Sequence, residues 1–446
     1  MQWELPEFVR AVARDLLVAG HSCYLVGGAV RDGLLGRTPH DYDLATDAAP
    51  GVVAALFPGA VADDAAFGRV LASGVDVLTL RRESEYKDRR RPSRVTFSRS
   101  IRADLARRDF TMNAMAVDLR TSEVVDPFAG RRDLALGVLR AVGPPERRFR
   151  EDALRVLRAV RLRAQLGLSY HPVLAAALTA AGEADLLRDL SAERVRDELT
   201  ACLMAPGCGV ALRDLQRHGL LRRVLPECLP TVGCSQTNPM HLYDVWEHSV
   251  RAVEAATPQA ELRWAALLHD VAKPACRTVD VQGMTHFYGH ETAGAGAAAA
   301  ILRRLRFPEA FTRRVAALVR YHMFSYAAET KPGAARRLVL ALGRDGVRGL
   351  LELRRADRAA SRWGQGYGPE GERLLLHLCA LDEAGERFEL RDLAVDGRDV
   401  MEALALTPGP RVGEVLRTLH QMVLDERVEN SREELLGAIR EGFGAS

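Results

Sequence analysis

A glycine pair near the N-terminus constrains the fold of this chain more than any other feature. Gly27 and Gly28 follow the apolar run 24–26, which predicts a strand, and precede the run 29–35, which predicts a helix. A strand, a tight turn and the start of a helix present backbone N–H groups to one point in space. This arrangement predicts a cradle for phosphate.

Two carboxylates, Asp41 and Asp43, follow one residue apart. If residues 41–45 form a strand, both side chains project from the same face and meet. Like charges repel unless a cation lies between them, and Mg²⁺ prefers hard oxygen ligands together with substrate phosphates. A phosphate cradle followed by paired carboxylates predicts nucleotidyl transfer.

Composition bounds the class of protein. A chain of 446 residues predicts two or more domains, and 48% hydrophobic with 27% charged residues is typical of a globular protein. No run of 18 apolar residues occurs, and the first residues do not resemble a signal peptide, so we expect no membrane span and a cytoplasmic location. The seven cysteines include no Cys-x-x-Cys pair, which disfavours zinc ribbons and a disulfide framework.

Positive charge is concentrated in one segment, although the net charge is only +3. Residues 81–108 carry eleven basic and four acidic side chains, and the block 87–91 is the densest part. Such a cluster beside a phosphate site predicts a nucleic-acid surface, with a solvated charged loop as the alternative.

Hydrophobic periodicity divides the chain into a mixed part and a helical part. Residues 20–126 predict a small mixed sheet with helices, and helix follows helix after about residue 131. The individual predictions are helices at 8–19, 50–57, 152–167, 192–204 and 211–218, strands at 69–72, 75–81, 95–97, 114–118 and 123–126, a mobile loop at 83–94, and a turn at 408–410 between two helices.

Two further segments carry groups suited to nucleotides. Arg108, Asp109 and Asn113 are suited to phosphate and ribose, with a capped helix start as the alternative. Asp152 and Arg155, at i and i+3 of a predicted helix, share a face. They form either an intrahelical salt bridge or an acceptor–donor pair that reads the edge of a nucleobase without a template.

These motifs together resemble the bacterial and eukaryotic class of tRNA nucleotidyltransferases, the CCA-adding enzymes, to which bacterial poly(A) polymerases also belong. The resemblance covers roughly residues 20–205. It rests on Leu-Val-Gly-Gly-x-Val-Arg-Asp, Asp-Tyr-Asp-Leu, Arg-Arg-Asp-Phe-Thr-x-Asn-Ala, Glu-Asp-x-Leu-Arg and the segment 191–199. It implies CTP and ATP as substrates, the tRNA 3′ end as partner, and two Mg²⁺ ions on Asp41 and Asp43. The implied nucleotide-binding residues are Gly27, Gly28, Arg31, Arg108, Asp109, Asn113, Asp152, Arg155, Arg158 and Arg161.

Two details bear on which nucleotides are added. Residues 82–92 resemble the flexible loop that this family needs for the final A, and the loop looks full length. The family often has an Asp after Val-Gly, whereas here Val142-Gly143 is followed by two prolines. Asp76 is a candidate third carboxylate. Addition of CCA, of CC only or of A only therefore all stay open.

A second group of residues predicts a metal centre. Six of the twelve histidines fall within residues 241–322, and an adjacent His269-Asp270 pair follows an apolar run. The order resembles the HD superfamily of metal-dependent phosphohydrolases. The resemblance implies a transition metal (Mn²⁺, Ni²⁺, Co²⁺ or Fe²⁺), with His248, His269, Asp270 and Asp357 as first-metal ligands, His290 and His322 for a second metal, and Lys273 for phosphate. It implies trimming of 2′,3′-cyclic phosphate or 2′-phosphate from RNA 3′ ends.

The expected fold class is α+β, with a polymerase-β-like mixed-sheet head, an all-α neck and body, and a helical HD domain. The expected domains are a head at 1–140, a nucleobase-selecting neck at 141–225, an HD domain at 226–365 and a helical tail at 366–446 that could grip tRNA. The alternatives are a poly(A) polymerase, an alarmone synthetase/hydrolase and a non-catalytic RNA-binding protein. The sequence leaves the oligomeric state open.

Overall fold

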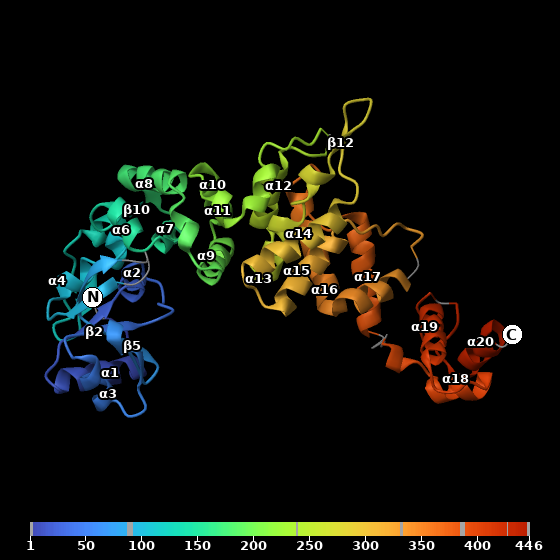
Figure 1. The fold of residues 1–446 in the computed structure, drawn as a ribbon, viewed down its shortest axis with the longest axis horizontal. Helices are drawn as coiled ribbons and strands as arrows, with labels where there is room; N and C mark the ends of the chain where they lie inside the picture. The colour runs from blue at the N-terminus through green and yellow to red at the C-terminus, as the bar shows by residue number, and fades with distance from the viewer. Residues whose placement is uncertain are drawn as a thin grey trace. The chain divides into compact units, whose positions relative to one another are not determined.

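The computed structural model describes residues 3–86, 92–237, 240–330, 333–383, 389–425 and 427–443. The chain divides into two compact units, Met1–Pro226 and Glu227–Ser446, which are described separately. Strands are concentrated in the first unit, and the second is almost entirely helical (Figure 1). The expected α+β organisation, a mixed-sheet head followed by a helical body, is confirmed.

A seven-stranded sheet forms the centre of the first unit, in the order β3-β4-β5-β2-β1-β8-β9. The pair β2 and β5 is parallel, and the other neighbours are antiparallel. The strands are β1 (Cys23–Val26), β2 (Asp43–Thr46), β3 (Val61–Asp64), β4 (Arg69–Ala72), β5 (Val75–Thr79), β8 (Ala116–Asp118) and β9 (Val124–Val125).

The strand β1 is paired on both edges and buried, which explains why it reads as a continuous apolar run. Its last residue, Val26, pairs with Asp43, the first residue of β2. Asp43 is in turn the register partner of Asp76 in β5. The glycine turn after β1, Asp43 and Asp76 are therefore neighbours at one end of three adjacent strands.

Helices accompany and follow this sheet. They are α1 (Glu7–Val18), α2 (Gly28–Leu34), α3 (Pro50–Leu56), α4 (Ile101–Leu105), α5 (Gly130–Ala135), α6 (Pro145–Glu151), α7 (Leu154–Leu166), α8 (Pro172–Glu183), α9 (Ala192–Met204), α10 (Cys208–Arg217) and α11 (Leu221–Val224). The short strands β10 (Val138–Leu139) and β11 (Ser169–Tyr170) pair in parallel.

At its two ends, 83–86 and 92–94, the segment 83–94 differs from its prediction as a loop. The strands β6 (Arg81–Tyr86) and β7 (Pro92–Phe97) form an antiparallel pair, with Tyr86 opposite Pro92. Backbone pairing does not require an apolar sequence at the edge of a fold, so polarity alone misled the prediction. Residues 87–91, the densest part of the basic segment, lie outside the described residues.

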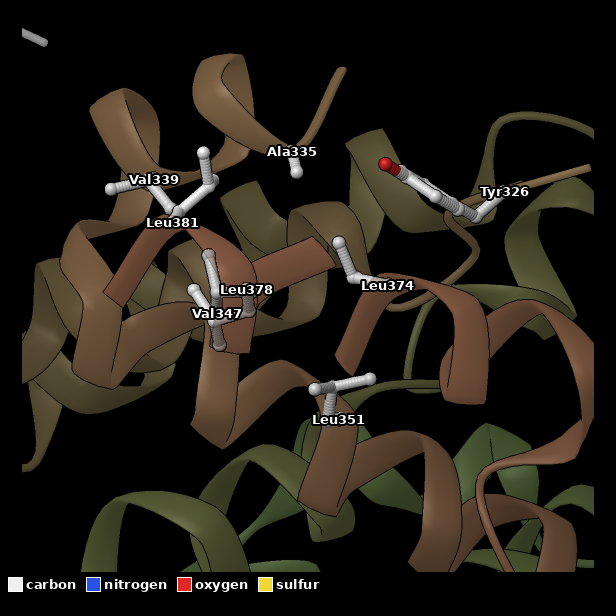
Figure 2. Packing of buried hydrophobic residues seen from close by; sticks show 8 residues of the cluster. All are labelled: Tyr326, Ala335, Val339, Val347, Leu351, Leu374, Leu378 and Leu381. Atoms are coloured by element: carbon white, nitrogen blue, oxygen red, sulfur yellow. The ribbon is translucent and has the colours of Figure 1, made fainter. Parts of the chain in front are cut away.

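The second unit is a stack of helices with one small hairpin. Its helices are α12 (Val245–Ala255), α13 (Ala260–Leu268), α14 (His290–Arg304), α15 (Glu309–Tyr321), α16 (Gly333–Ala359), α17 (Gly368–Glu383), α18 (Gly397–Leu404), α19 (Pro410–Leu424) and α20 (Arg432–Phe443); the hairpin strands are β12 (Thr278–Val279) and β13 (Thr285–His286). Figure 2 shows Val339 and Val347 of α16 beside Leu381 and Leu378 of α17, in one buried cluster.

The last three helices share a separate apolar cluster that includes Val400, Leu419 and Ile439. In the described parts of the chain, no helix is both long and apolar enough to cross a bilayer.

Gly182 tests the packing of the first unit. It lies buried in α8, and a Cβ atom there would overlap the carbonyl oxygen of His218. We expect Gly182→Ala to destabilise the protein by about 1–3 kcal/mol, because backbone must move to admit the methyl group. The matched variant is Gly51→Ala in α3, where nothing lies within 4 Å, and its stability should stay unchanged or rise. Thermal unfolding followed by circular dichroism measures both, and equal melting temperatures would contradict the packing described here.

Candidate functional site

The glycine turn lies directly against two charged side chains. Gly27 has φ 73°, a conformation that side-chain-bearing residues rarely adopt. A Cβ atom there would lie 3.1 Å from Arg108 Nη1 and 3.8 Å from Asp43 Oδ2. The turn thus brings backbone next to both a guanidinium and a carboxylate.

The three carboxylates of this region differ in their surroundings. Asp43 is half-buried, and burial raises its pKa; Arg108 opposes this rise, while Asp76 and Asp41 add to it. Asp76 accepts two hydrogen bonds from Arg69, at 2.8 and 3.0 Å. The side chain of Asp41 is 90% exposed and precedes β2. The prediction of a strand from residue 41 is therefore wrong, and strand alternation does not set the direction of Asp41.

Several predicted nucleotide-binding residues form a hydrogen-bonded network around the buried side chains of Asp109 and Asn113. Arg31 donates to Asn113 Oδ1 (2.9 Å) and pairs with Asp32. Asn113 donates to Asp109 Oδ1 (3.2 Å), and Asp109 Oδ2 lies 2.8 Å from Arg158 Nε. Burial opposes ionisation of Asp109, but Arg158 and Arg155 outweigh it and lower its pKa. These side chains are engaged with one another around the carboxylate of Asp109.

Asp152 does not share a helix with Arg155. It adopts an extended conformation between α6 and α7, so the predicted i, i+3 pair on one helix is wrong. A helix break there frees the carboxylate to accept from Leu154 N, at 3.1 Å, and from Arg194 Nη2, at 2.9 and 3.0 Å. Arg155 instead donates to Glu151 Oε2 and to the carbonyl of Arg107, both at 3.0 Å.

Helix α9 thus supplies two supporting residues that the sequence did not identify. Arg194 holds Asp152, and Glu198 accepts from Arg161 Nε at 2.7 Å. Both lie in the motif at 191–199, four residues apart and therefore on one face of α9. That spacing was the available signal, although it did not identify the partners.

Four buried imidazoles converge in the second unit. His248 comes from α12, His269 follows α13, His290 begins α14 and His322 follows α15. Each Nδ1 lies within 3.3 Å of a backbone carbonyl, those of Ala360, Ala266, Phe287 and Val319 respectively. These carbonyls favour a proton on Nδ1, which leaves a lone pair on each Nε2. The Nε2 atoms nevertheless lie in pairs, with 3.3 Å between His248 and His269 and 3.2 Å between His290 and His322.

Two carboxylates complete this group. Asp357 Oδ1, from α16, lies 2.9 Å from His248 Nε2. Asp270 Oδ2 lies 3.2 Å from His269 Nε2, and Asp270 Oδ1 lies 3.4 Å from His290 Nε2. The six residues form two sets whose ligand atoms lie within 4.8 Å of one another: His248, His269 and Asp357, and then Asp270, His290 and His322. Asp270 belongs to the second set, although its Oδ2 also lies close to His269 of the first, whereas the resemblance gave Asp270 to the first metal.

The donor set fits divalent cations. Facing lone pairs on imidazoles repel, and a cation between them removes the repulsion. Burial opposes ionisation of Asp270, but His269 and Lys273 hold its pKa well below the usual range, whereas burial lowers the pKa of His322 to about 4. Among the described residues, neither oxygen of Asp270 accepts a well-oriented hydrogen bond, although Lys273 Nζ lies 2.7 Å from Oδ2. Lys273 also donates to Gln236 Oε1 at 2.8 Å.

These residues border a cavity of about 1150 Å³. His269, Asp270, Lys273, His290, His322 and Asp357 all line it. The wall also contains Arg320 and Arg358 and the side chains of Tyr288 and Trp363. The cavity is large enough for a nucleotide-sized ligand.

Comparison with known proteins identifies the family. Residues 23–140 match the poly(A) polymerase head domain, residues 167–230 match the probable RNA- and SrmB-binding site of polymerase A, and residues 292–439 match tRNA nucleotidyltransferase domain 2. The A-adding tRNA nucleotidyltransferase of Deinococcus radiodurans is 38% identical over 421 residues, which cover 89% of this chain and 90% of that protein. The CCA-adding enzyme of Geobacillus stearothermophilus is 32% identical over 446 residues, covering 98% and 97%.

A solved structure supports the same assignment. The crystal structure of the Bacillus stearothermophilus CCA-adding enzyme in complex with CTP matches with a TM-score of 0.72 and 29% identity, covering 98% of each chain. Family matches in both units and relatives that align along nearly the whole chain agree with each other. The chain belongs to the class II tRNA nucleotidyltransferases, the family of CCA-adding enzymes and poly(A) polymerases.

Proposed function

We propose that the protein extends tRNA 3′ ends from CTP and ATP without a template and that its product includes the terminal A. The observation that carries the proposal is the register of β1, β2 and β5, which aligns the glycine turn, Asp43 and Asp76. The A-adding and CCA-adding relatives support the nucleotides named. Poly(A) polymerase, CC-only addition and A-only addition are the alternatives for the product.

The head residues fit Mg²⁺. Asp43 is a half-buried carboxylate whose pKa is raised by burial and by repulsion from Asp76 and Asp41, so a cation beside it is favoured. When bound by Asp41 and Asp43, Mg²⁺ supplies charge neutralisation for phosphoryl transfer. Gly27 admits the triphosphate close to the backbone, and Arg108 faces the same turn. The 3′-oxygen of the RNA bonds to the α-phosphorus, the bond to pyrophosphate breaks, and the hydroxyl proton leaves to solvent.

Base selection in this proposal belongs to Asp152 and Arg155, as acceptor and donor. Arg194 holds both oxygens of Asp152, and Glu151 holds Arg155. The two proposed base-selecting side chains, Asp152 and Arg155, are therefore held in place by different residues.

The first experiment uses purified protein, Mg²⁺ and three labelled tRNA transcripts that end before CCA, after C and after CC. CTP and ATP are supplied singly and together. Extension of all three to a finished CCA end is the expected result for a complete CCA-adding enzyme. Extension of only the CC-ending transcript with ATP identifies an A-adding enzyme, whereas long A tails identify a poly(A) polymerase.

In the same assay, Asp43→Ala should reduce incorporation more than about a hundredfold, because the transition-state charge loses its stabilising cation. Binding of tRNA, measured by filter retention, should be nearly unchanged. Asp63→Ala removes an exposed carboxylate from β3 and serves as the matched control. Full incorporation by Asp43→Ala would refute the metal assignment.

We expect the Arg194→Ala substitution to lower the enzyme's selectivity for CTP and ATP over UTP and GTP. Without its guanidinium, Asp152 keeps one backbone hydrogen bond and can turn away from the base. We expect incorporation of UTP or GTP relative to CTP and ATP to rise by about tenfold, the equivalent of losing one hydrogen bond of about 1.4 kcal/mol. Arg188→Ala, whose side chain is 65% exposed, is the control. A uniform loss with every nucleotide would indicate a structural role instead.

We also propose that the second unit is a metal-dependent phosphohydrolase acting on RNA 3′ ends. The four converging Nε2 atoms around Asp270 carry this proposal. A divalent metal bound there supplies Lewis-acid activation of water and neutralises phosphate charge. In the reaction, a water oxygen bonds to phosphorus, the bond from phosphorus to a ribose oxygen breaks, and that oxygen takes up a proton. Lys273, already between Asp270 and Gln236, is suited to contact the phosphate.

The test offers RNAs ending in 2′,3′-cyclic phosphate or 2′-phosphate to protein loaded with Mn²⁺, Ni²⁺ or Co²⁺. We expect hydrolysis, and we expect Asp270→Asn to abolish it and to lower bound metal measured by mass spectrometry. Nucleotide addition by Asp270→Asn should persist, and helical circular dichroism equal to that of the parent protein shows that the second unit is folded. Ends left untouched by all three metal-loaded forms would remove this proposal.

A further inference from the structure

Two exposed aromatic side chains border the cavity beside the metal-ligand candidates. Tyr288 is 78% exposed and lies two residues before His290, and Trp363 is 56% exposed and lies six residues after Asp357. Both line the cavity. Single exposed aromatic residues are ordinary on a protein surface. Here two of them line one cavity, and each is close in sequence to a member of a different candidate metal set, so their exposure calls for a physical explanation.

Each ring is supported on one side. Tyr288 stacks on His286, with ring centroids 5.3 Å apart and planes at 5°. His286 is itself anchored 2.7 Å from Asp280 across the β12–β13 hairpin. Tyr288 therefore has one face backed by a fixed imidazole, and its high exposure leaves the other side open to solvent.

Trp363 is supported in a similar way. Arg358 lies over its ring, 5.6 Å from the centroid, and donates to the Trp363 carbonyl at 2.9 Å. Trp363 N donates to Ser361 Oγ at 3.3 Å. The two hydrogen bonds fix the backbone of Trp363, and the guanidinium of Arg358 contacts one face of its indole ring.

Charge around the cavity would favour an anion once cations offset its carboxylates, which are Asp270, Glu291, Asp357 and Glu370. Lys273 and Arg320 contribute cationic groups, with Arg320 about half exposed and 3.8 Å from Glu291. Metal ions at the two sets would offset Asp270 and Asp357. Aromatic platforms next to cations are the features that bind unstacked bases and their phosphates.

We propose that this cavity recognises the base of an RNA 3′-terminal nucleotide by stacking on Tyr288 or Trp363, while the terminal phosphate reaches the metal centre. The inference rests on the proposed phosphohydrolase and narrows its substrate class. The site takes nucleosides that carry a 2′- or 2′,3′-cyclic phosphate and discriminates against phosphate esters that lack a base.

The test compares two substrates with the same reacting group. Adenosine 2′,3′-cyclic phosphate carries a base, and methyl ribofuranoside 2,3-cyclic phosphate does not. Each reaction is quenched, Mn²⁺ is removed from the sample, and hydrolysis of the phosphate ester is measured by ³¹P NMR. We expect kcat/KM to be at least about tenfold higher with the base, because stacking on an aromatic ring contributes about 1–3 kcal/mol per base. Tyr288→Ala and Trp363→Ala should remove much of this difference through KM and leave the base-free substrate unchanged.

Conservative variants and a neighbour separate stacking from structure. Tyr288→Phe and Trp363→Phe keep a ring and should keep most of the preference. Met323→Ala changes an exposed apolar residue (58%) that lines the same cavity and should have little effect. Equal rates on the two substrates, or equal losses on both in the alanine variants, would overturn the inference.

A binding measurement is independent of hydrolysis. Trp246 and Trp264 are buried, so Trp363 is the tryptophan of this unit that a ligand can reach. Adenosine 2′-phosphate should quench its fluorescence in the full-length protein, and Trp363→Phe should lose that quenching. Quenching without hydrolysis would refute the phosphohydrolase and retain the base site. If hydrolysis persists but the protein shows neither fluorescence quenching nor a preference for the substrate with a base, the base site alone is refuted.

Discussion

The head is organised by one backbone register, in which the end of β1 pairs with the start of β2 and β2 pairs with β5. The apolar pattern of these buried strands fixes the register, since a slip of one residue would separate Asp43 from its present neighbours Val26 and Asp76. The glycine turn depends on it as well, because Gly27 lies against both Arg108 and Asp43. The hydrogen-bonded network of charged residues from Arg31 to Arg158 lies beside this part of the sheet.

In the second unit, the ends of helices position the side chains of the candidate metal centre. His269 and His322 follow the last residues of α13 and α15, and His290 begins α14. Nearby backbone carbonyls accept from Nδ1 and turn every Nε2 inward. Both centres thus bring electron-rich atoms together at positions fixed by backbone hydrogen bonding, and in both the resulting repulsion is what a cation relieves.

Local patterns predicted local structure well. Apolar spacing located α9 at Ala192–Met204 and the paired strands β8 and β9, because each depends on neighbours in sequence. The errors at Asp41 and Asp152 have a different origin. The start of β2 is set by its partner Val26, and Asp152 is held by Arg194, 42 residues away. Residue spacing contains neither fact, although the motif resemblance indicated the right family. The six histidine and aspartate residues of the second unit that the sequence grouped do lie together, but the closeness of Asp270 to both His269 and His290 required distances.

Most cationic groups suggested for phosphate or base already have anionic partners. Arg31 pairs with Asp32, Arg155 with Glu151, and Lys273 with Asp270. A buried cation without a partner would strongly destabilise the empty protein, so these pairs keep each site folded before substrate arrives. A substrate phosphate or base at these residues, as we propose, would therefore share or replace a carboxylate rather than fill an empty positive site. Such exchange lowers the net gain from each contact, and it favours ligands that present several groups at once, as a nucleoside triphosphate or an RNA end does.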